Sequence, residues 1–185
     1  MTEPAPSATA FSAQTAEPEH VKLLRERLGA KVLDVAVNDG QWRVALERDA
    51  LLDAEQFLRD DPRTDFRMLI DVTALDHHPA EPRFRVVHVL RSLSKRCDLV
   101  LKVAVPEDDC WAPSAAGLFP TANWLERECW DMFGVKFRGH PDLRRILMPD
   151  DFPDHPLRKD FPVQGKMTDQ EWAEWVVARA QREEG

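Results

Sequence analysis

The chain has 185 residues, 43% hydrophobic and 31% charged, which is enough for one folded domain with a continuous core. Lys and Arg number 25 against 33 Asp and Glu, and the net charge of −8 disfavours binding to nucleic acid or anionic lipid. The longest uncharged run, residues 110–125, contains two prolines and is too short to span a membrane as a helix.

The N-terminal residues 1–19 form an acidic tail rich in Pro, Ala, Ser and Thr, which we expect to be disordered. The tail has neither the basic start and apolar stretch of a secretory signal nor the Arg of a mitochondrial presequence, so we expect a cytosolic protein. Order is predicted to begin with a helix over residues 20–28, where Val21, Leu24 and Leu28 share one face.

A hairpin and a second helix are predicted next. Apolar residues alternate over residues 33–37 and 42–46, and the intervening Asn38-Asp39-Gly40 is a typical tight-turn sequence. Residues 49–59 then carry apolar side chains at helical spacing, and Asp61-Pro62 ends this helix.

Three further segments alternate strictly between apolar and polar residues, namely 66–72, 84–90 and 99–105. Such alternation is typical of an antiparallel or mixed sheet with one solvated face, and we expect helices to cover the other face. The predicted fold class is therefore α+β, with about five strands in a domain over residues 20–122. His88 lies on an apolar strand face and is expected to be a hydrogen-bonded core residue.

The region 123–185 is predicted to hold a helix, an extended segment and a terminal helix. The first helix starts near Thr121 and is closed by Gly134. Its expected apolar face consists of Leu125, Cys129, Met132 and Phe133. Cys129 on this face is expected to be a small core residue and not a nucleophile.

Residues 134–166, called the strip below, contain five prolines and no periodicity. This composition predicts an extended segment that lies over a surface. The terminal helix begins at Thr168 with a capping box to Glu171. Its apolar stripe must pack on something and consists of Trp172, Trp175 and Val176.

Motifs for common cofactors and nucleophiles are missing from the sequence. It contains no GxGxxG or GxxxxGK[ST] phosphate loop and no GxSxG serine elbow. The three cysteines form no CxxC pair and cannot supply the four thiolates of an iron–sulfur cluster, a pattern that suits a reducing compartment. They are Cys97, Cys110 and Cys129.

The histidines His77-His78, His140 and His155 lack zinc-type spacing, which favours turn-stabilising hydrogen bonds over metal ligation. The run Glu126-Arg127-Glu128 with Asp131 contains an acid and a base that could exchange protons. Pairing of Arg127 with Asp131 four residues later is the commoner outcome on a solvated helix face.

Two stretches of the strip echo each other. Arg144-Arg145 and Arg158-Lys159 each follow a His-Pro and precede apolar residues. An extended, proline-stiffened segment with cationic and apolar anchors suits a partner surface, but it could equally tie down its own domain. We expect its Arg and Lys to be too numerous for internal pairing.

Residues 123–165 contain a nearly unbroken series of motifs: Glu126-Arg127-Glu128, Asp131-Met132-Phe133-Gly134, Gly139-His140-Pro141, Leu143-Arg144-Arg145-Ile146-Leu147 and His155-Pro156-Leu157-Arg158-Lys159-Asp160-Phe161-Pro162. This segment closely resembles the signature region of the 30 kDa subunit of respiratory complex I, known in bacteria as the C subunit of NADH-quinone oxidoreductase. Two positions depart from the usual pattern, Cys129 and Asp154, and the departure at Asp154 concerns only a local turn.

The resemblance implies a subunit without cofactor or catalytic residue in the peripheral arm of a complex that oxidises NADH, reduces a quinone and pumps protons. NADH, FMN, the iron–sulfur clusters and the quinone would belong to partner subunits. The implied neighbours are the 49 kDa (D-type) subunit and other peripheral-arm subunits, on the cytoplasmic side of the bacterial inner membrane without insertion into it.

We predict a partner interface on the charged residues of the matching segment. Two alternatives stay open: the equivalent subunit of a membrane-bound [NiFe]-hydrogenase or ferredoxin-linked complex, and a free-standing hydrolase that uses the histidines and acidic residues of this segment. The predicted interface residues are Glu126, Arg127, Glu128, Asp131, His140, Arg144, Arg145, His155, Arg158, Lys159 and Asp160.

Overall fold

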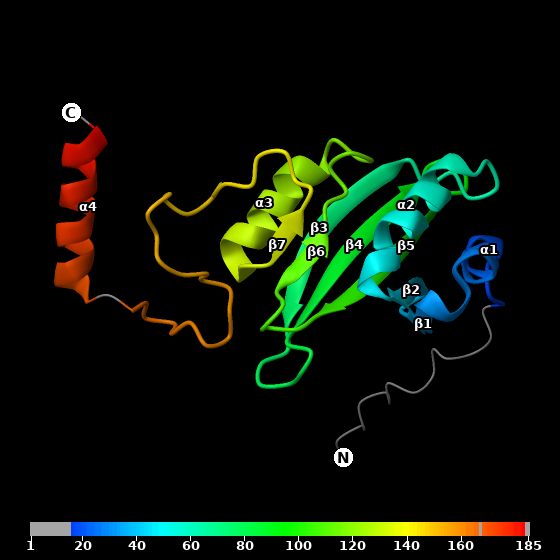
Figure 1. The fold of residues 1–185 in the computed structure, drawn as a ribbon, viewed down its shortest axis with the longest axis horizontal. Coiled ribbons are helices and arrows are strands. Elements are labelled where there is room, and N and C mark those ends of the chain that lie inside the picture. Colours follow the sequence, from blue (N-terminus) through cyan, green and yellow to red (C-terminus); the bar gives the residue numbers. More distant parts are fainter. Residues whose placement is uncertain (1–15, 167, 184–185) are drawn as a thin grey trace, which may run out of the picture.

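The computed structural model describes residues 16–166 and 168–183. Most of the predicted tail, residues 1–15, lies outside the described residues. Figure 1 shows a twisted sheet with α2 and α3 against one face, α1 beside α2, and α4 apart from these elements. No helix in the described ranges is long and apolar enough to cross a bilayer.

The predicted order of helices and strands is confirmed. The first helix, the hairpin, the second helix and the three later strands all form close to the predicted residues. The elements are α1 (Glu19–Leu28), η1 (Gly29–Lys31), β1 (Val32–Asn38), β2 (Gln41–Leu46), η2 (Arg48–Ala50), α2 (Leu51–Asp60), β3 (Met68–Asp76), β4 (Phe84–Ser92), β5 (Cys97–Val105), β6 (Trp111–Pro113), α3 (Ala122–Phe133), β7 (Lys136–Arg138) and α4 (Asp169–Glu183).

Five strands form one mixed sheet in the order β1-β2-β5-β4-β3. All neighbours are antiparallel except β2 and β5, which run parallel. The hairpin between β1 and β2 closes through a two-residue turn at Asp39-Gly40, with φ values of 51° and 75°. Both values are positive, as a type I′ turn requires, and the α+β fold class is confirmed.

The strict alternation predicted over residues 66–72 is wrong. The strand begins at Met68, and the register with β4 shifts between Leu69 and Asp71. This β-bulge inserts one extra residue, Ile70, and so exchanges the faces on its two sides. As a result Met68 and Ile70 are exposed, whereas Leu69 is buried.

The core lies between the inner face of the sheet and the helices α1, α2 and α3. His88 is fully buried there, and its Nδ1 lies 2.6 Å from Oε1 of Glu55 on α2. The expectation of a hydrogen-bonded core histidine is therefore confirmed. Burial alone would lower the pKa of His88, but the Glu55 carboxylate opposes it and the net shift is upward.

A second sheet escaped prediction because each of its strands has only three residues and shows no alternation. β6 and β7 pair in parallel, with Trp111 opposite Lys136. The Trp111 ring lies between two guanidinium groups, 4.0 Å from that of Arg48 and 3.6 Å from that of Arg138. This small sheet fixes the start of the strip beside β6.

The apolar face predicted for α3 is confirmed in part. Cys129 is buried as expected and burial raises its thiol pKa. The half-buried Leu125 and Phe133 pack against the core, whereas the half-buried Met132 is not part of this cluster. The fully buried side chains of this helix include the carboxylates of Glu126 and Asp131. Polar groups buried this deeply need hydrogen-bond partners, which identifies them as structural anchors.

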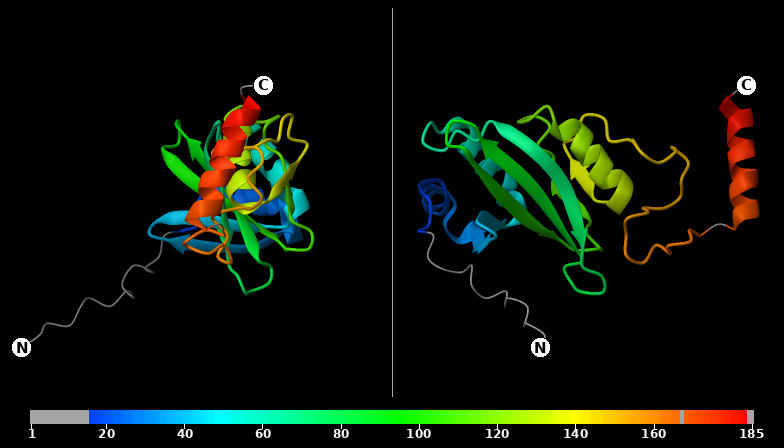
Figure 2. Two further views of the ribbon diagram at one scale, coloured as in Figure 1. Left: turned by 90° about the vertical axis from the view of Figure 1, so that its left-hand side faces the viewer. Right: turned by 180° about the vertical axis from the view of Figure 1, so that it is seen from behind.

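The terminal helix α4 forms as predicted, and its capping box is confirmed. The Thr168 N–H donates to Glu171 Oε2 at 2.7 Å, and the Glu171 N–H donates to Thr168 Oγ1. The expected packing of the aromatic stripe is not found among the described residues. The rings of Trp172 and Trp175 stack on each other, and α4 stands away from the sheet in all three ribbon views (Figures 1 and 2).

The hairpin turn generates a stability prediction. Gly40→Ala places a side chain at a φ of 75° and should destabilise the chain by about 1 kcal/mol, since L-residues are strained there. Gly117→Ala is the matched control, because Gly117 has ordinary φ and open space around it. Urea denaturation of both variants measures the difference, and equal midpoints would contradict the assigned turn.

Candidate partner interface

The strip donates hydrogen bonds to the C-terminal end of α3. The last four carbonyl groups of this helix, residues 130–133, each accept a hydrogen bond from the strip. Free carbonyls at a helix end attract N–H donors and cations, so the strip completes the helix. The donors are the backbone N–H groups of Gly134 and Leu157, Nδ1 of His155 and Nε of Arg158.

Asp131 anchors the middle of the strip. Its buried Oδ2 accepts the backbone N–H groups of Ile146, Leu147 and Met148 at 3.0, 2.8 and 2.9 Å, and its Oδ1 pairs with Arg145. Burial alone would raise the pKa of Asp131, but these donors outweigh burial and lower it. Because Asp131 accepts three successive N–H groups and also pairs with Arg145, it fixes the backbone of residues 146–148 as well as the Arg145 side chain.

The predicted pairing of Arg127 with Asp131 is wrong. Arg127 donates from Nε and Nη2 to the carbonyl groups of Arg144 and Arg145, at 3.1 and 2.9 Å. Arg145 in turn reaches the carbonyl of Phe152 at 2.6 Å, and its side chain is only 9% exposed. Asp131 binds the strip and not Arg127, so both of these α3 residues hold the strip.

The two His-Pro motifs act at opposite ends of α3. His140 Nε2 lies 3.0 Å from the Asn123 carbonyl in the first turn, and the Asp142 N–H donates to its Nδ1. His155 Nδ1 bonds the Asp131 carbonyl in the last turn at 2.8 Å. The predicted turn-stabilising role is confirmed for His140, through its bond to the Asp142 N–H, whereas His155 joins the strip to α3. Within the described residues no three His, Cys, Asp or Glu side chains gather as a metal site.

Glu126 holds the segment that leads into α3. Its Oε2 accepts the Ser114 hydroxyl and its Oε1 accepts the Ala115 N–H, both at 2.6 Å. Burial raises the pKa of Glu126 from 4.5 to about 7. The helix therefore carries a buried acid whose charge changes near neutral pH.

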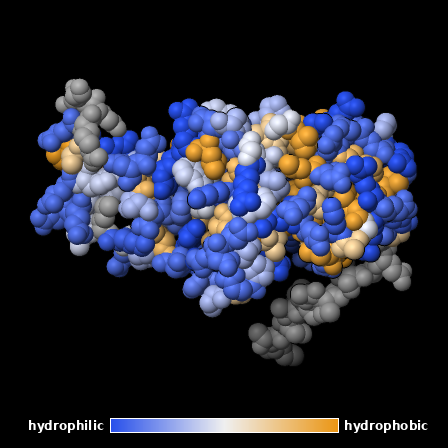
Figure 3. All heavy atoms as spheres, viewed as in Figure 1, coloured by the Kyte–Doolittle hydropathy of each residue, from blue (hydrophilic) through white to orange (hydrophobic). Residues whose placement is uncertain are grey.

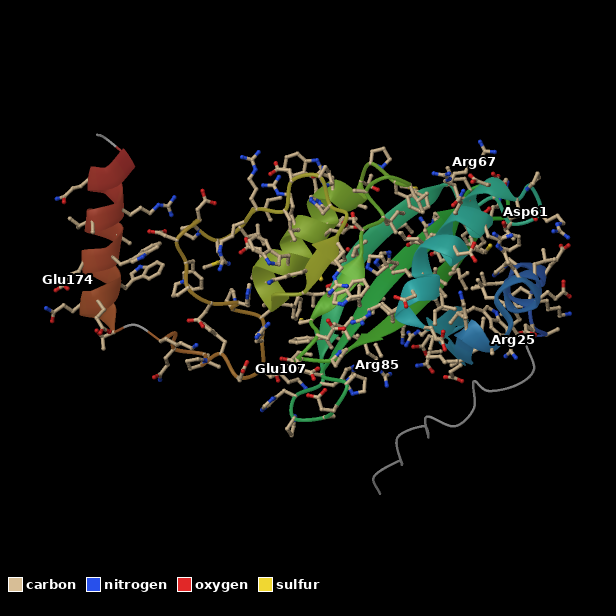
Figure 4. The ribbon with its side chains drawn as sticks, viewed as in Figure 1. Arg25, Asp61, Arg67, Arg85, Glu107 and Glu174 are labelled. Atoms are coloured by element: carbon tan, nitrogen blue, oxygen red, sulfur yellow. The ribbon has the colours of Figure 1, made fainter. Side chains whose placement is uncertain are left out.

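A second anchor of the strip was missed by sequence reasoning. The Arg83 side chain, 2% exposed, binds Asp76 with two hydrogen bonds and Asp160 of the strip with two more. It also pairs with Glu107, which Figure 4 places beside the loop between β3 and β4. Asp76 accepts the Lys159 N–H at 2.8 Å. The sequence did hold one signal for this anchor. Asp76 alternates in phase with Val72 and Ala74, which places an acid on the buried face of β3.

Arg158 joins the strip to the sheet. Its guanidinium lies 5.2 Å from the Phe84 ring centroid, and a Cβ at Gly134 would come within 2.5 Å of its Nη2. Only glycine suits that position, where φ is 80°. The expectation that the cations of the strip are too numerous for internal pairing is wrong for Arg145 and Arg158, because backbone carbonyls serve as acceptors.

Four predicted interface residues remain accessible from outside. Glu128, Lys159 and Asp160 are exposed, and the Arg144 side chain is 68% exposed beside Asp142. Hydrophilic side chains predominate over the strip and α4 in Figure 3. One apolar pocket of about 340 Å³ lies between the strip and the start of α4. Its apolar lining includes Met148, Phe152, Phe161, Val163 and Trp172.

α3 and the strip lie within a segment of the chain that matches a known protein family. Residues 44–167 match the family described as respiratory-chain NADH dehydrogenase, 30 Kd subunit. The chain belongs to this family. The predicted resemblance is thereby confirmed, and the match extends it upstream of residues 123–165 to residue 44, within β2.

Several members of the 30 kDa family are similar to this chain. The C subunit of NADH-quinone oxidoreductase from Geobacter sulfurreducens is 44% identical over 143 residues, covering 77% of this chain and 87% of that protein. That of Roseiflexus sp. is 44% identical over 142 residues, covering 75% and 82%. The C/D subunit of Chromohalobacter salexigens is 42% identical over 187 residues, covering 90% of this chain and 31% of that protein.

Two solved structures have a fold similar to that of this chain. One is the trypsin-resistant fragment (1-134) of Nqo5, with a TM-score of 0.59 and 32% identity, covering 67% of this chain and 99% of the fragment. The other belongs to the membrane-bound sulfane sulfur reductase, an archaeal respiratory membrane complex. Its TM-score is 0.66 at 24% identity, with 77% and 84% covered, which shows the fold alone.

Glu126 generates a pH prediction. Its pKa is higher in the folded state, so folding favours the protonated acid and stability falls as pH rises from about 4.5 to about 7, by about 3 kcal/mol in all. Glu126→Gln keeps an acceptor for Ala115 and a polar group for Ser114 without the charge. The variant should match the wild type near pH 5 and melt higher at pH 8; parallel stability curves from pH 5 to 8 would contradict this.

Proposed function

We propose that this chain is a cofactor-free subunit of the peripheral arm of a proton-pumping NADH-quinone oxidoreductase, where it braces the 49 kDa (D-type) subunit near the quinone site. The observation that carries the proposal is the 44% identity to proteins named as the C subunit of this enzyme, over 82% and 87% of their length. The strip supports it as well. It is held rigidly on α3 while it presents charged side chains outward, which lowers the entropy cost of binding.

The choice of the D-type subunit as neighbour rests on the C/D relative. In that protein a segment similar to 90% of this chain forms 31% of a longer chain. Two subunits joined in one chain must lie close enough for their connection to span them. In this chain the strip and α4 are the last described segments, and the exposed apolar side chains of α4 suit a partner surface.

The proposed role leaves this chain without catalysis of its own. The acidic, basic and His side chains of the signature region that are not exposed are occupied in holding the strip or the segment before α3, as shown for Glu126, Arg127, Asp131 and Arg145. NADH, FMN, iron–sulfur clusters and quinone are assigned to partner subunits. Membrane association is then peripheral, through the complex, on the cytoplasmic side.

A second candidate is the equivalent subunit of a membrane-bound hydrogenase or a related ferredoxin-linked complex. The fold shared with a chain of the sulfane sulfur reductase complex keeps it open, because that fold occurs in a respiratory membrane complex of another name. Sequence similarity favours the quinone oxidoreductase, because its relatives reach 44% identity against 24%. Affinity purification of the tagged chain from native membranes tests the choice: we expect the NADH-binding subunits to co-purify, and hydrogenase subunits in their place would overturn it.

The strip generates an assembly prediction. Arg144→Glu alters an exposed side chain and should change stability by at most about 1 kcal/mol while it lowers the yield of assembled enzyme. Arg145→Glu is the contrast, because it places a second carboxylate against buried Asp131 and should cost about 3–5 kcal/mol. Thermal melts of each chain and NADH:quinone reductase activity of membranes separate the two effects. Normal assembly with Arg144→Glu would remove Arg144 from the interface.

The proposed lack of cofactors gives a direct measurement. The purified chain should be colourless and contain no stoichiometric iron, zinc or flavin, since its histidines bind backbone carbonyls of α3. Elemental analysis and absorbance spectra check this. Stoichiometric zinc that disappears in His140→Ala or His155→Ala would contradict it.

A further inference from the structure

The outer face of the five-stranded sheet has no helix over it among the described elements. Seen from behind in Figure 2, the strands lie in front and the helices behind them. This face is apolar at its centre, where Val87 on β4 and Val100 on β5 are only 8% and 4% exposed. Leu75 at the β3 edge is 44% exposed. It is the side of the sheet opposite to α3 and the strip.

Three cations cross this outer face on one diagonal. Arg43 on β2 pairs in register with Val100, and Lys102 two residues further along β5 pairs with Val87. Arg85 lies two residues before Val87 on β4, and Figure 4 shows it at that end of the strand. Side chains two residues apart share a face, and diagonal neighbours on adjacent strands lie about 7–8 Å apart. The three positive groups therefore form a row across β2, β5 and β4.

These three cations differ from the other strand cations nearby. Arg91, on the same face, forms an ion pair with Asp98 at 2.6 Å. Among the described residues neither Arg43, Lys102 nor Arg85 has a carboxylate within ion-pair distance. Burial lowers the pKa of Lys102, and repulsion by Arg43 and Arg85 lowers it further, against a smaller opposing effect of Asp34. The chain is acidic as a whole, yet three cations that repel one another lie together on the outer face of the sheet.

We propose that this face is a docking surface for an acidic segment of another protein subunit, whose carboxylates pair with Arg43, Lys102 and Arg85 while its apolar side chains cover Val87, Val100 and Leu75. Alternate residues of a strand or residues four apart on a helix place carboxylates about 6–7 Å apart, close to the spacing of the cations. Charge complementarity of this kind fixes register and speeds encounter.

A protein partner fits the surroundings of the row better than a polyanion does. Asp34 on β1 and Asp71 on β3 lie on the same outer face, one on each side of the cations. They would repel an extended phosphate backbone or an anionic membrane, but a folded partner can direct its own cations toward them. The docking surface is separate from the strip, so it does not rest on which residues of the strip contact a neighbour.

Carbodiimide cross-linking of the intact, purified complex tests the proposal. This reagent joins a Lys amine to a carboxylate in direct contact, and Lys102 is the lysine on the row. We expect a Lys102 peptide joined to an Asp or Glu peptide of another subunit, and at least tenfold less of it after Lys102→Gln. Acetylation of Lys102 in the native complex at the rate seen for exposed Lys22, with no cross-link, would overturn the proposal.

Charge reversal supplies a second and independent readout. Lys102→Glu places a carboxylate between two arginines, so the melting temperature of the full chain should stay equal or rise, whereas about tenfold less of the partner should remain bound at moderate salt. Lys22→Glu on α1 is the matched control and should retain the partner. Unchanged retention with Lys102→Glu overturns the proposal, as does Lys102-dependent binding of the chain to heparin or phosphatidylserine vesicles. Loss of the NADH-binding subunits from every sample would instead refute the proposed function.

Discussion

The end of α3 sets the constraint on which the C-terminal half of the structure depends. Its buried carboxylate, Asp131, and the carbonyls of its last turn need donors, because an unpaired polar group in this environment costs about 1–3 kcal/mol. The strip provides those donors from backbone N–H groups, one histidine and two arginines. The strip in turn needs α3, since it has no helix or strand of its own after β7. Each segment is completed by the other.

The sequence predicts the parts of this fold whose signal is periodic. The alternation in β4 and β5 and the spacing in α1 and α2 report directly which side chains are buried, and the sheet follows from them. The buried face of β3 was predicted wrongly, because a bulge at Ile70 exchanges the two faces of the strand and the hydrophobic pattern does not show the bulge. The inner face of α3 departs because its buried side chains are acids, whose partners lie far away in the chain.

The cations of α3 and the strip show a different limit of sequence reasoning. Arg127, Arg145 and Arg158 were all predicted to lie at a partner interface, and the expected internal partner of Arg127 was Asp131. The structure satisfies Arg127 and Arg158 with backbone carbonyls and Arg145 with carbonyls as well as Asp131. Every residue type has the same carbonyl, so this mode of pairing carries no compositional signal. The exposure of Arg144 beside the burial of Arg145 was equally invisible in the sequence.

The parallel contact between β2 and β5 has a consequence for the order of folding. The β1-β2 hairpin and the β3-β4-β5 meander are local units, whereas the β2-β5 pairing joins residues more than fifty positions apart and closes a long loop. We expect the two units to form early and their junction to be slow. α3 and then the strip are synthesised after the whole sheet, so a nascent chain that ends before residue 155 would hold a complete sheet beneath a helix in which the carbonyls of Met132 and Phe133 still lack their donors.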